Sequence, residues 1–162
     1  MKLDLPYFFY TLSFALGTLF LTLAFIPKQE IKKLFWFGIL WGSGLDFLVE
    51  NIFHLVHLTK YQYMEPFNIG VLPLWTILAW APAIMLFIYF LPQRIERYIY
   101  WIYVIMWSTF ISFVAVILRQ LDILVFINGG PWIWFISSFV FLYLMTKHYR
   151  FLEAKRADPS LS

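Results

Sequence analysis

Cysteine is absent from this chain of 162 residues, and charged residues are scarce. Without cysteine, the chain can form no disulfide, no thiolate metal site and no cysteine nucleophile. Charged residues make up 13% of the chain, whereas soluble domains usually contain about 25%. The sequence also lacks a phosphate-binding loop, a dinucleotide fingerprint, a Ser–His–Asp ordering and any nucleic-acid motif. A soluble enzyme of these common classes and a nucleic-acid partner are therefore excluded.

Apolar and aromatic residues dominate instead, at 62% and 23% of the chain. A helix needs about 18 or more apolar residues to cross a bilayer. Five segments meet this length, at 6–26, 34–58, 69–91, 98–127 and 131–149. The sequence therefore predicts an all-α, polytopic membrane bundle of five helices. We expect residues 1–149 to form this single domain and residues 150–162 to form a polar cytoplasmic tail.

The end of the fourth segment has two interpretations. Either the helix stops at Leu118 and residues 119–122 form a loop, or it continues to Ile127. Residues 128–131 read Asn-Gly-Gly-Pro, in which glycine permits a positive φ and proline suits the first position of the next helix. This stop-and-start signal favours the longer helix.

Lysine and arginine are distributed unevenly between the two ends of the predicted bundle. One end has nine of them, and the other has Lys2, Lys60 and, if it lies in a loop, Arg119. The nine are Lys28, Lys32, Lys33, Arg94, Arg97, Lys147, Arg150, Lys155 and Arg156. Under the positive-inside rule, this difference predicts an integral plasma (inner) membrane protein with its N-terminus outside and its C-terminus in the cytoplasm.

Four ionisable residues of the second segment share one helix face: Asp46, Glu50, His54 and His57. At about 100° per residue they fall within a sector of roughly 80°. Each such group costs roughly 2.5–3.5 kcal/mol at a bilayer centre, so four aligned groups indicate a protein-lined or water-filled site. Asn51 adjoins Glu50 and is a further candidate ligand-binding residue.

Arg119 and Asp122 form a matching polar face if the fourth helix continues to Ile127. We expect Arg119 to lie inside the membrane and to pair with Glu50 or Asp122. Asp46, Glu50 and Asp122 would then supply three carboxylates against one arginine. A proton, a protonated histidine, a cation or water must supply the missing charge.

Other features favour packing over chemistry. We interpret four glycines as sites of close helix approach, namely Gly17, Gly38, Gly42 and Gly44. Two of them, Gly38 and Gly42, have the spacing of a helix-packing motif. Trp75 and Trp80, near Thr76, are candidates to line a ligand pocket, but lipid contact is the favoured interpretation for these tryptophans.

Three functions follow from these patterns. The leading hypothesis is an outward-facing ionisable cavity that binds a proton, a cation or a small polar ligand, including a lipid head group. The second is an intramembrane enzyme acting on a lipid or isoprenoid, with a divalent Zn, Mn or Fe ion held by Glu50, His54 and His57. The third is an accessory or scaffold subunit whose polar network is structural. The expected partners are the bilayer, the ligand, and a second copy or another membrane protein.

Overall fold

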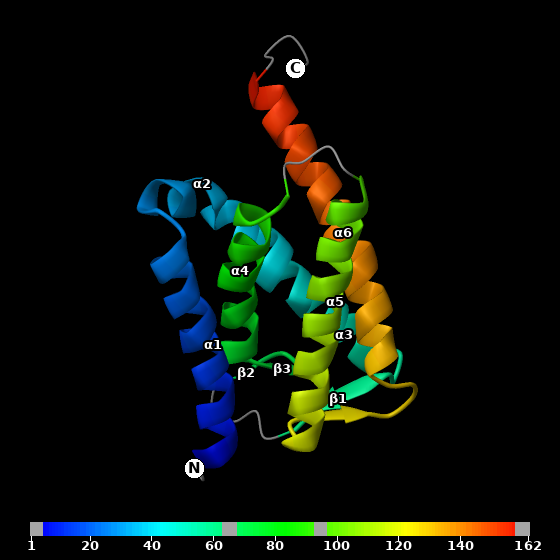
Figure 1. The fold of residues 1–162 in the computed structure, drawn as a ribbon. Helices are drawn as coiled ribbons and strands as arrows, with labels where there is room; N and C mark the ends of the chain where they lie inside the picture. Colours follow the sequence, from blue (N-terminus) through cyan, green and yellow to red (C-terminus); the bar gives the residue numbers. More distant parts are fainter. Residues whose placement is uncertain (1–4, 63–67, 93–96, 158–162) are drawn as a thin grey trace.

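The chain folds into a bundle of helices with short strands at one end (Figure 1). The computed structural model describes residues 5–62, 68–92 and 97–157. The helices are α1 (Leu5–Phe25), α2 (Lys28–Gly38), the π-helical turn η1 (Ile39–Gly44), α3 (Leu45–Leu55), α4 (Leu74–Tyr89), α5 (Arg97–Gln120) and α6 (Pro131–Ala157). The strands are β1 (Thr59–Tyr61), β2 (Asn68–Ile69), β3 (Leu72–Pro73) and β4 (Leu124–Phe126). The predicted all-α class is confirmed.

Two helices are long and apolar enough to cross a membrane, at Tyr7–Phe25 within α1 and Tyr98–Gln120 within α5. The second predicted segment is interrupted by η1, and α4 has only 16 residues. The last helix continues past Tyr149, so residues 150–157 of the predicted tail are helical. The rest of that predicted tail lies outside the described residues.

Helix α4 is the centre of the bundle. Its side chains are buried from Thr76 to Ile88 except for Leu78, which faces outward. Figure 1 shows α4 between α1 and α5. The Thr22 hydroxyl of α1 donates a hydrogen bond to the Pro82 carbonyl oxygen at 3.1 Å. Apolar residues around the circumference of α4 fit this position, because neighbours cover every side of it except the one that carries Leu78.

Gly38 and Gly42 pack directly on the backbone of α4. A Cβ atom built on Gly38 would lie 2.8 Å from the Ala81 carbonyl oxygen. One built on Gly42 would lie 2.6 Å from the Trp80 carbonyl carbon and 2.8 Å from the Ala81 Cα. The predicted role in close helix packing is confirmed for Gly38 and Gly42, and their partner is another helix of the same chain. It is wrong for Gly17, where nothing lies within 4 Å of a Cβ, and for Gly44, where a Cβ would meet only the Ile39 carbonyl oxygen of the adjoining turn at 3.4 Å.

The fourth predicted helix is shorter than expected. It ends at Gln120, and the prediction that it continues to Ile127 is wrong. The Ile123 N–H donates to the Leu118 carbonyl at 2.9 Å, and the Asp122 N–H donates to that of Arg119 at 3.0 Å. Asp122 has a φ of 57°. This is a Schellman cap, in which a left-handed residue stops the helix.

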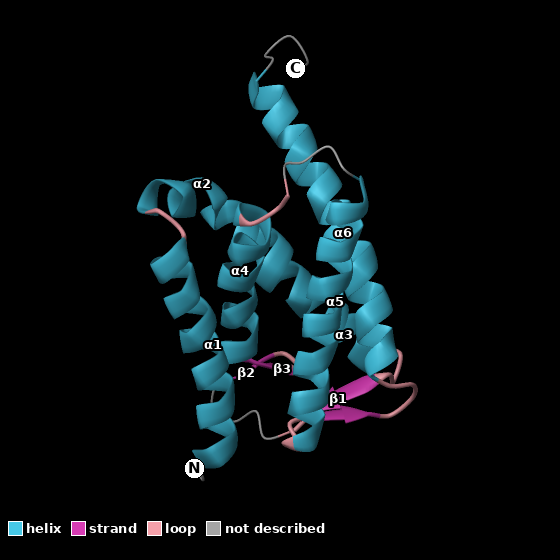
Figure 2. Cartoon of the chain, in the orientation of Figure 1, coloured by secondary structure: helices cyan, strands magenta, loops and turns pink. Residues whose placement is uncertain are grey.

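Helix α3 ends with the same cap. The Leu58 N–H donates to the Phe53 carbonyl at 2.8 Å, the His57 N–H donates to that of His54 at 3.1 Å, and His57 has a φ of 56°. After each of these two caps the chain continues as a strand, β1 after α3 and β4 after α5, and the two strands pair in antiparallel register (Figure 2). The backbone hydrogen bonds that a longer α5 would have made within the helix are made between these strands instead.

The turn before α6 agrees with the sequence. Gly129 has a φ of 89°, and α6 begins at Pro131. Proline has no backbone N–H, and it suits the first position of a helix because an N–H at that position would have no partner within the helix.

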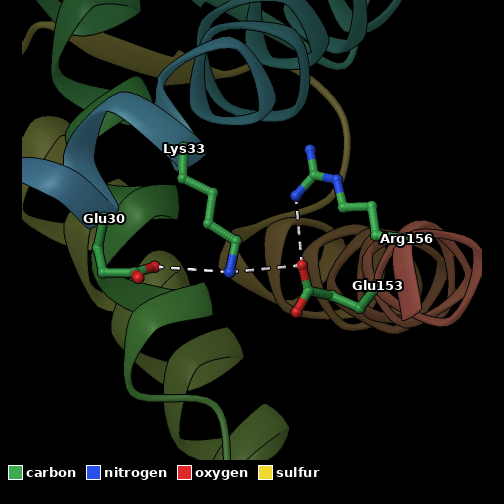
Figure 3. Close-up of polar contacts among 4 residues, drawn as sticks. All are labelled: Glu30, Lys33, Glu153 and Arg156. Carbon is green, nitrogen blue, oxygen red and sulfur yellow. Dashed lines mark hydrogen bonds and ion pairs between the residues drawn. The ribbon is translucent and has the colours of Figure 1, made fainter.

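One ion pair connects α2 to α6, and each of these two helices has a further pair of its own (Figure 3). Lys33 contacts Glu30 at 3.7 Å and Glu153 at 3.6 Å, and Arg156 contacts Glu153 at 3.3 Å. These side chains are between 38% and 59% exposed, so we expect each exposed pair to contribute only about 0–1 kcal/mol.

We expect Gly42→Ala to destabilise the fold by about 1–3 kcal/mol, because its methyl group would overlap the α4 backbone. Gly17→Ala is the matched control, since nothing lies within 4 Å of a Cβ at that position. This control should be neutral or slightly stabilising. Unfolding of both variants in detergent, followed by circular dichroism, measures the difference. Equal stabilities would contradict the close packing described above.

Candidate functional site

A partly open cavity of about 90 Å³ lies among the helices of the bundle, and Asp46 and Glu50 both line it. These two residues are one turn apart on α3, so their side chains point in the same direction. The cavity walls come from η1, α3, α4, α5 and α6. The other large side chains on these walls are Trp41, Phe53, Trp80, Ile84, Ile111, Trp134, Phe141, Leu142 and Met145. Two serines of α6, Ser137 and Ser138, line it too, and their hydroxyls donate to the Trp134 and Phe135 carbonyls at 3.2 and 3.0 Å. The site is therefore a largely apolar, aromatic cavity with two carboxyl groups and two hydroxyl groups.

The start of α3 is fixed against α4 by the turn η1. Gly42 lies on the α4 backbone, and the Ser43 hydroxyl donates to the Ile77 carbonyl at 2.7 Å. At the end of the turn, the Leu45 N–H donates to the carbonyl of Leu40, five residues earlier, whereas the bond in an α-helix goes back four residues. This extra residue per turn shifts the direction of the side chains that follow. Asp46, one residue after Leu45, owes its direction to this turn.

The two carboxyl groups have few partners. Glu50 is 3% exposed, and its Oε2 accepts a hydrogen bond from the Thr59 hydroxyl of β1 at 3.3 Å. The Asp46 Oδ2 atom is buried and has no hydrogen-bond donor among the described residues. Of the lining residues that the structure describes, none is lysine, arginine or histidine. The cavity thus concentrates acidic groups without a cationic side chain to balance them.

Two of the tryptophans that line the cavity have unpaired donors. The indole nitrogens of Trp80 and Trp134 are buried and have no acceptor within the described part of the chain, and these side chains are 5% and 4% exposed. An unpaired buried donor costs about 1–3 kcal/mol. These two donors are covered by the surrounding side chains, since each nitrogen has almost no accessible surface.

Tyr61 on β1 is buried next to this site, and its hydroxyl has no partner in the described regions. Burial raises the pKa of Tyr61 well above its usual value, and the carboxyl groups of Glu50 and Asp46 raise it further. The hydroxyl therefore remains protonated at neutral pH.

The rest of the predicted polar face does not reach the cavity. Asn51 donates to the Phe47 carbonyl of its own helix at 2.6 Å. His54 and His57 are exposed, and His57 is the left-handed residue that ends α3. The structure therefore does not bring Glu50, His54 and His57 together as metal ligands. Among residues 5–62, 68–92 and 97–157, no group of three histidine, aspartate or glutamate side chains is close enough to hold a metal ion.

Arg119 and Asp122 also lie outside the cavity. Both are exposed, because α5 ends beside them. The Arg119 guanidinium lies 6.0 Å from the centre of the Phe126 ring. The expected ion pair of Arg119 with Glu50 or Asp122 is not formed, since no ion pair of the described chain includes Arg119.

Sequence reasoning missed most of the aromatic walls. Trp80 lines the cavity, whereas lipid contact was the favoured expectation for it. Trp41 lines the cavity as well, and its indole donates to Nδ1 of His148 at 2.9 Å. The position of Trp80 near the middle of the apolar segment 69–91 carried a signal, because membrane tryptophans usually lie near the interfaces. Trp134 carried none, since it lies one turn after the start of its segment.

Comparisons with protein-family models, with curated proteins and with solved structures gave no match to this chain. The function is therefore argued from the geometry of the cavity.

Proposed function

We propose that the chain is an integral membrane protein that crosses the plasma (inner) membrane five times. In addition to the two long apolar helices, large apolar side chains face outward on several elements. Examples are Phe20 on α1, Ile102 on α5 and Ile136 on α6, which are 69%, 62% and 53% exposed. Lipid contact gives these side chains the apolar surroundings that water does not. In this arrangement the second crossing begins near the end of α2, at residue 34, and continues through η1 and α3.

The positions of the chain ends support the proposed orientation. The N-terminal end of α1 and the strands lie at one end of the bundle, and the C-terminal end of α6 lies at the other (Figure 1). Helix α2, with Lys28, Lys32 and Lys33, lies at the same end as the C-terminal end of α6, which carries Lys155 and Arg156. This basic end is the cytoplasmic one in our proposal.

Single cysteines at the two chain ends test the five crossings. The natural chain has no cysteine, so Lys2→Cys and Ser162→Cys each introduce one thiol. In intact cells, an impermeant thiol reagent should label the first variant and not the second. After the membrane is permeabilised, both should be labelled. Labelling of both thiols in intact cells would contradict an odd number of crossings.

The proposed function is binding of a proton, a cation or a small polar ligand, such as a lipid head group, at Asp46 and Glu50. One observation carries this proposal: two carboxyl groups line one partly open cavity, and no described cationic side chain lines it with them. Two uncompensated charges in an apolar site are costly. A bound proton or cation reduces this cost, so the site favours uptake of positive charge.

A purely structural network is the competing explanation, and the hydrogen bonds argue against it. Buried polar groups that serve only to hold helices together are normally paired with each other. Here the Asp46 Oδ2 and the indole nitrogens of Trp80 and Trp134 have no partner in the described regions. A self-paired structural network would not leave them so.

Neutral isosteres test the binding function. We expect the double variant Asp46→Asn/Glu50→Gln to lose stabilisation by cations and by small polar ligands, because it keeps the shape of the site and removes its charge. Thermal unfolding in lipid nanodiscs is measured across pH 5–9 with Na⁺, K⁺, Mg²⁺, ethanolamine and phosphocholine. A ligand at 100 times its Kd should stabilise the wild-type protein by about 2.7 kcal/mol.

Asp122→Asn is the control for this experiment, because Asp122 is an exposed carboxylate outside the cavity, and asparagine also tolerates a left-handed backbone. It should respond to pH and to ligands as the wild-type protein does. If no probe stabilises the wild-type protein, and the double variant has the same pH dependence as the wild type, the structural explanation is the correct one.

A further inference from the structure

A column of stacked aromatic rings follows the seam between α5 and α6, which lie side by side (Figure 1). Trp101 of α5 stacks on Phe139 and Tyr143 of α6, with ring centres 5.7 and 5.6 Å apart and ring planes 16° and 13° from parallel. Phe135 continues the column, and its ring centre lies 6.4 Å from that of Phe139. All four rings are half-buried, so part of each ring reaches the surface of the bundle.

Two cationic side chains of α6 lie at one end of this aromatic column. The Lys147 ammonium lies 5.6 Å from the centre of the Tyr143 ring, and the Arg150 guanidinium lies 5.0 Å from that of Tyr100 on α5. Residues three apart are neighbours on a helix surface, so the two cations are close to each other. Contact with a ring face holds a cation in place and leaves most of its N–H groups available to an acceptor.

Neither cation forms an ion pair within the described part of the chain. Glu153 is one turn beyond Arg150, but it is paired with Lys33 at 3.6 Å and with Arg156 at 3.3 Å. Lys147 and Arg150 are both exposed. Two neighbouring positive charges therefore face outward without a carboxylate of their own, and they favour an anionic partner.

The position of these cations along α6 matches the level of lipid head groups. Helix α6 begins at Pro131, next to the 61% exposed Trp132, as expected where a helix enters a bilayer. At 1.5 Å per residue, Lys147 and Arg150 lie about 24 and 28 Å farther along the helix, and the hydrocarbon core is about 30 Å thick. Tyr98, near the start of the adjacent α5, is 63% exposed and fits the aromatic belt at this second interface.

The aromatic column suits one acyl chain of a lipid in the cytoplasmic leaflet. From Phe135 to Lys147 it extends about 18 Å, and half of the hydrocarbon core is about 15 Å thick. The outward-facing side chains near it are apolar: Ile102 on α5, and Val140 and Leu144 on α6, are 62%, 45% and 47% exposed. An acyl chain at the seam would therefore contact apolar groups along its whole length.

We infer that an anionic phospholipid of the cytoplasmic leaflet binds at the α5–α6 seam. Its phosphate group accepts hydrogen bonds from Lys147 and Arg150, and one of its acyl chains lies along the aromatic column. The inference rests on the proposed membrane orientation, because the head group must lie at the cytoplasmic end of α6. It does not involve Asp46 or Glu50, since none of the four rings of the column lines their cavity.

Brominated lipids test this inference, because bromine atoms on an acyl chain quench the fluorescence of a tryptophan that they contact. The contribution of Trp101 is the difference between the wild-type protein and Trp101→Phe, which keeps a stacking ring. The protein is placed in phosphatidylcholine bilayers that contain brominated phosphatidylglycerol or brominated phosphatidylcholine. Since each cation near an anionic head group raises the affinity about fivefold, phosphatidylglycerol should bind at the seam about five to 25 times more tightly than phosphatidylcholine.

Paired substitutions separate this site from the general positive charge of the cytoplasmic end. Lys147→Gln/Arg150→Gln should abolish the preference for phosphatidylglycerol, whereas Lys147→Arg/Arg150→Lys, which keeps both charges, should retain most of it. Lys155→Gln/Arg156→Gln is the matched control, and it should retain the whole preference. It removes the same charge from the same helix, but about 9–12 Å farther along, beyond the Debye length of about 8 Å in physiological salt. Circular dichroism confirms that each variant is folded.

Inorganic phosphate distinguishes a lipid site from a site for free phosphate. At an ionic strength matched with sodium chloride, it should leave the preference for phosphatidylglycerol unchanged. Displacement of the brominated lipid by inorganic phosphate would overturn the inference. An equal loss of preference in the control variant and in Lys147→Gln/Arg150→Gln would overturn it as well.

Failure of this inference is distinguishable from failure of the proposed function. If both brominated lipids quench Trp101 equally while Lys2→Cys and Ser162→Cys are labelled as expected, the lipid site is wrong and the orientation stands. If neither lipid quenches Trp101, the lipid site is wrong, and labelling of both thiols in intact cells would show that the orientation is wrong too. Asp46→Asn/Glu50→Gln should keep the lipid preference, whatever it does to binding in the cavity.

Discussion

The close approach of Gly42 to α4 is the contact on which the rest of the structure depends. A side chain at position 42 would overlap the backbone at Trp80 and Ala81, so the turn η1 can lie on α4 only because glycine has no Cβ. This contact fixes the point from which α3 starts. It places Asp46 and Glu50 on the cavity side of α3 and Trp80 on the facing wall.

The opposite end of α3 limits how much of its polar face belongs to the cavity. The Schellman cap at His57 turns the chain into β1, where Thr59 donates its hydrogen bond to Glu50. His54 and His57 are left at the exposed end of the helix. A face of four ionisable residues thus divides into two that line a cavity and two near a helix terminus. Only the first pair bears the cost of burial, and only that pair enters the proposed function.

Local signals in the sequence predicted the parts of the fold that depend on local chemistry. Pro131 and Gly129 marked the start of α6, and Gly38 and Gly42 marked a close helix contact. The end of α5 was not predictable in this way. Its cap uses an aspartate in a conformation that usually favours glycine, and it is supported by pairing with β1, a strand more than 60 residues earlier in the chain.

The candidate site was predictable only in part, for the same reason. Helical periodicity placed Asp46 and Glu50 on one face, because that relation is local. The π-helical turn that directs them, the missing cationic partner and the indoles on the facing walls depend on how distant segments meet. The expected role of Arg119 failed at this point, since it required a helix that continues past Gln120.

The central claim is that the acidic cavity is a binding site, and an experimental density map of the protein in lipid nanodiscs tests it most directly. We expect non-protein density in contact with Asp46 and Glu50 in the wild-type protein, and loss of this density in Asp46→Asn/Glu50→Gln at the same resolution. A dry cavity in which the two carboxyl groups pair with other side chains of the protein would contradict the claim.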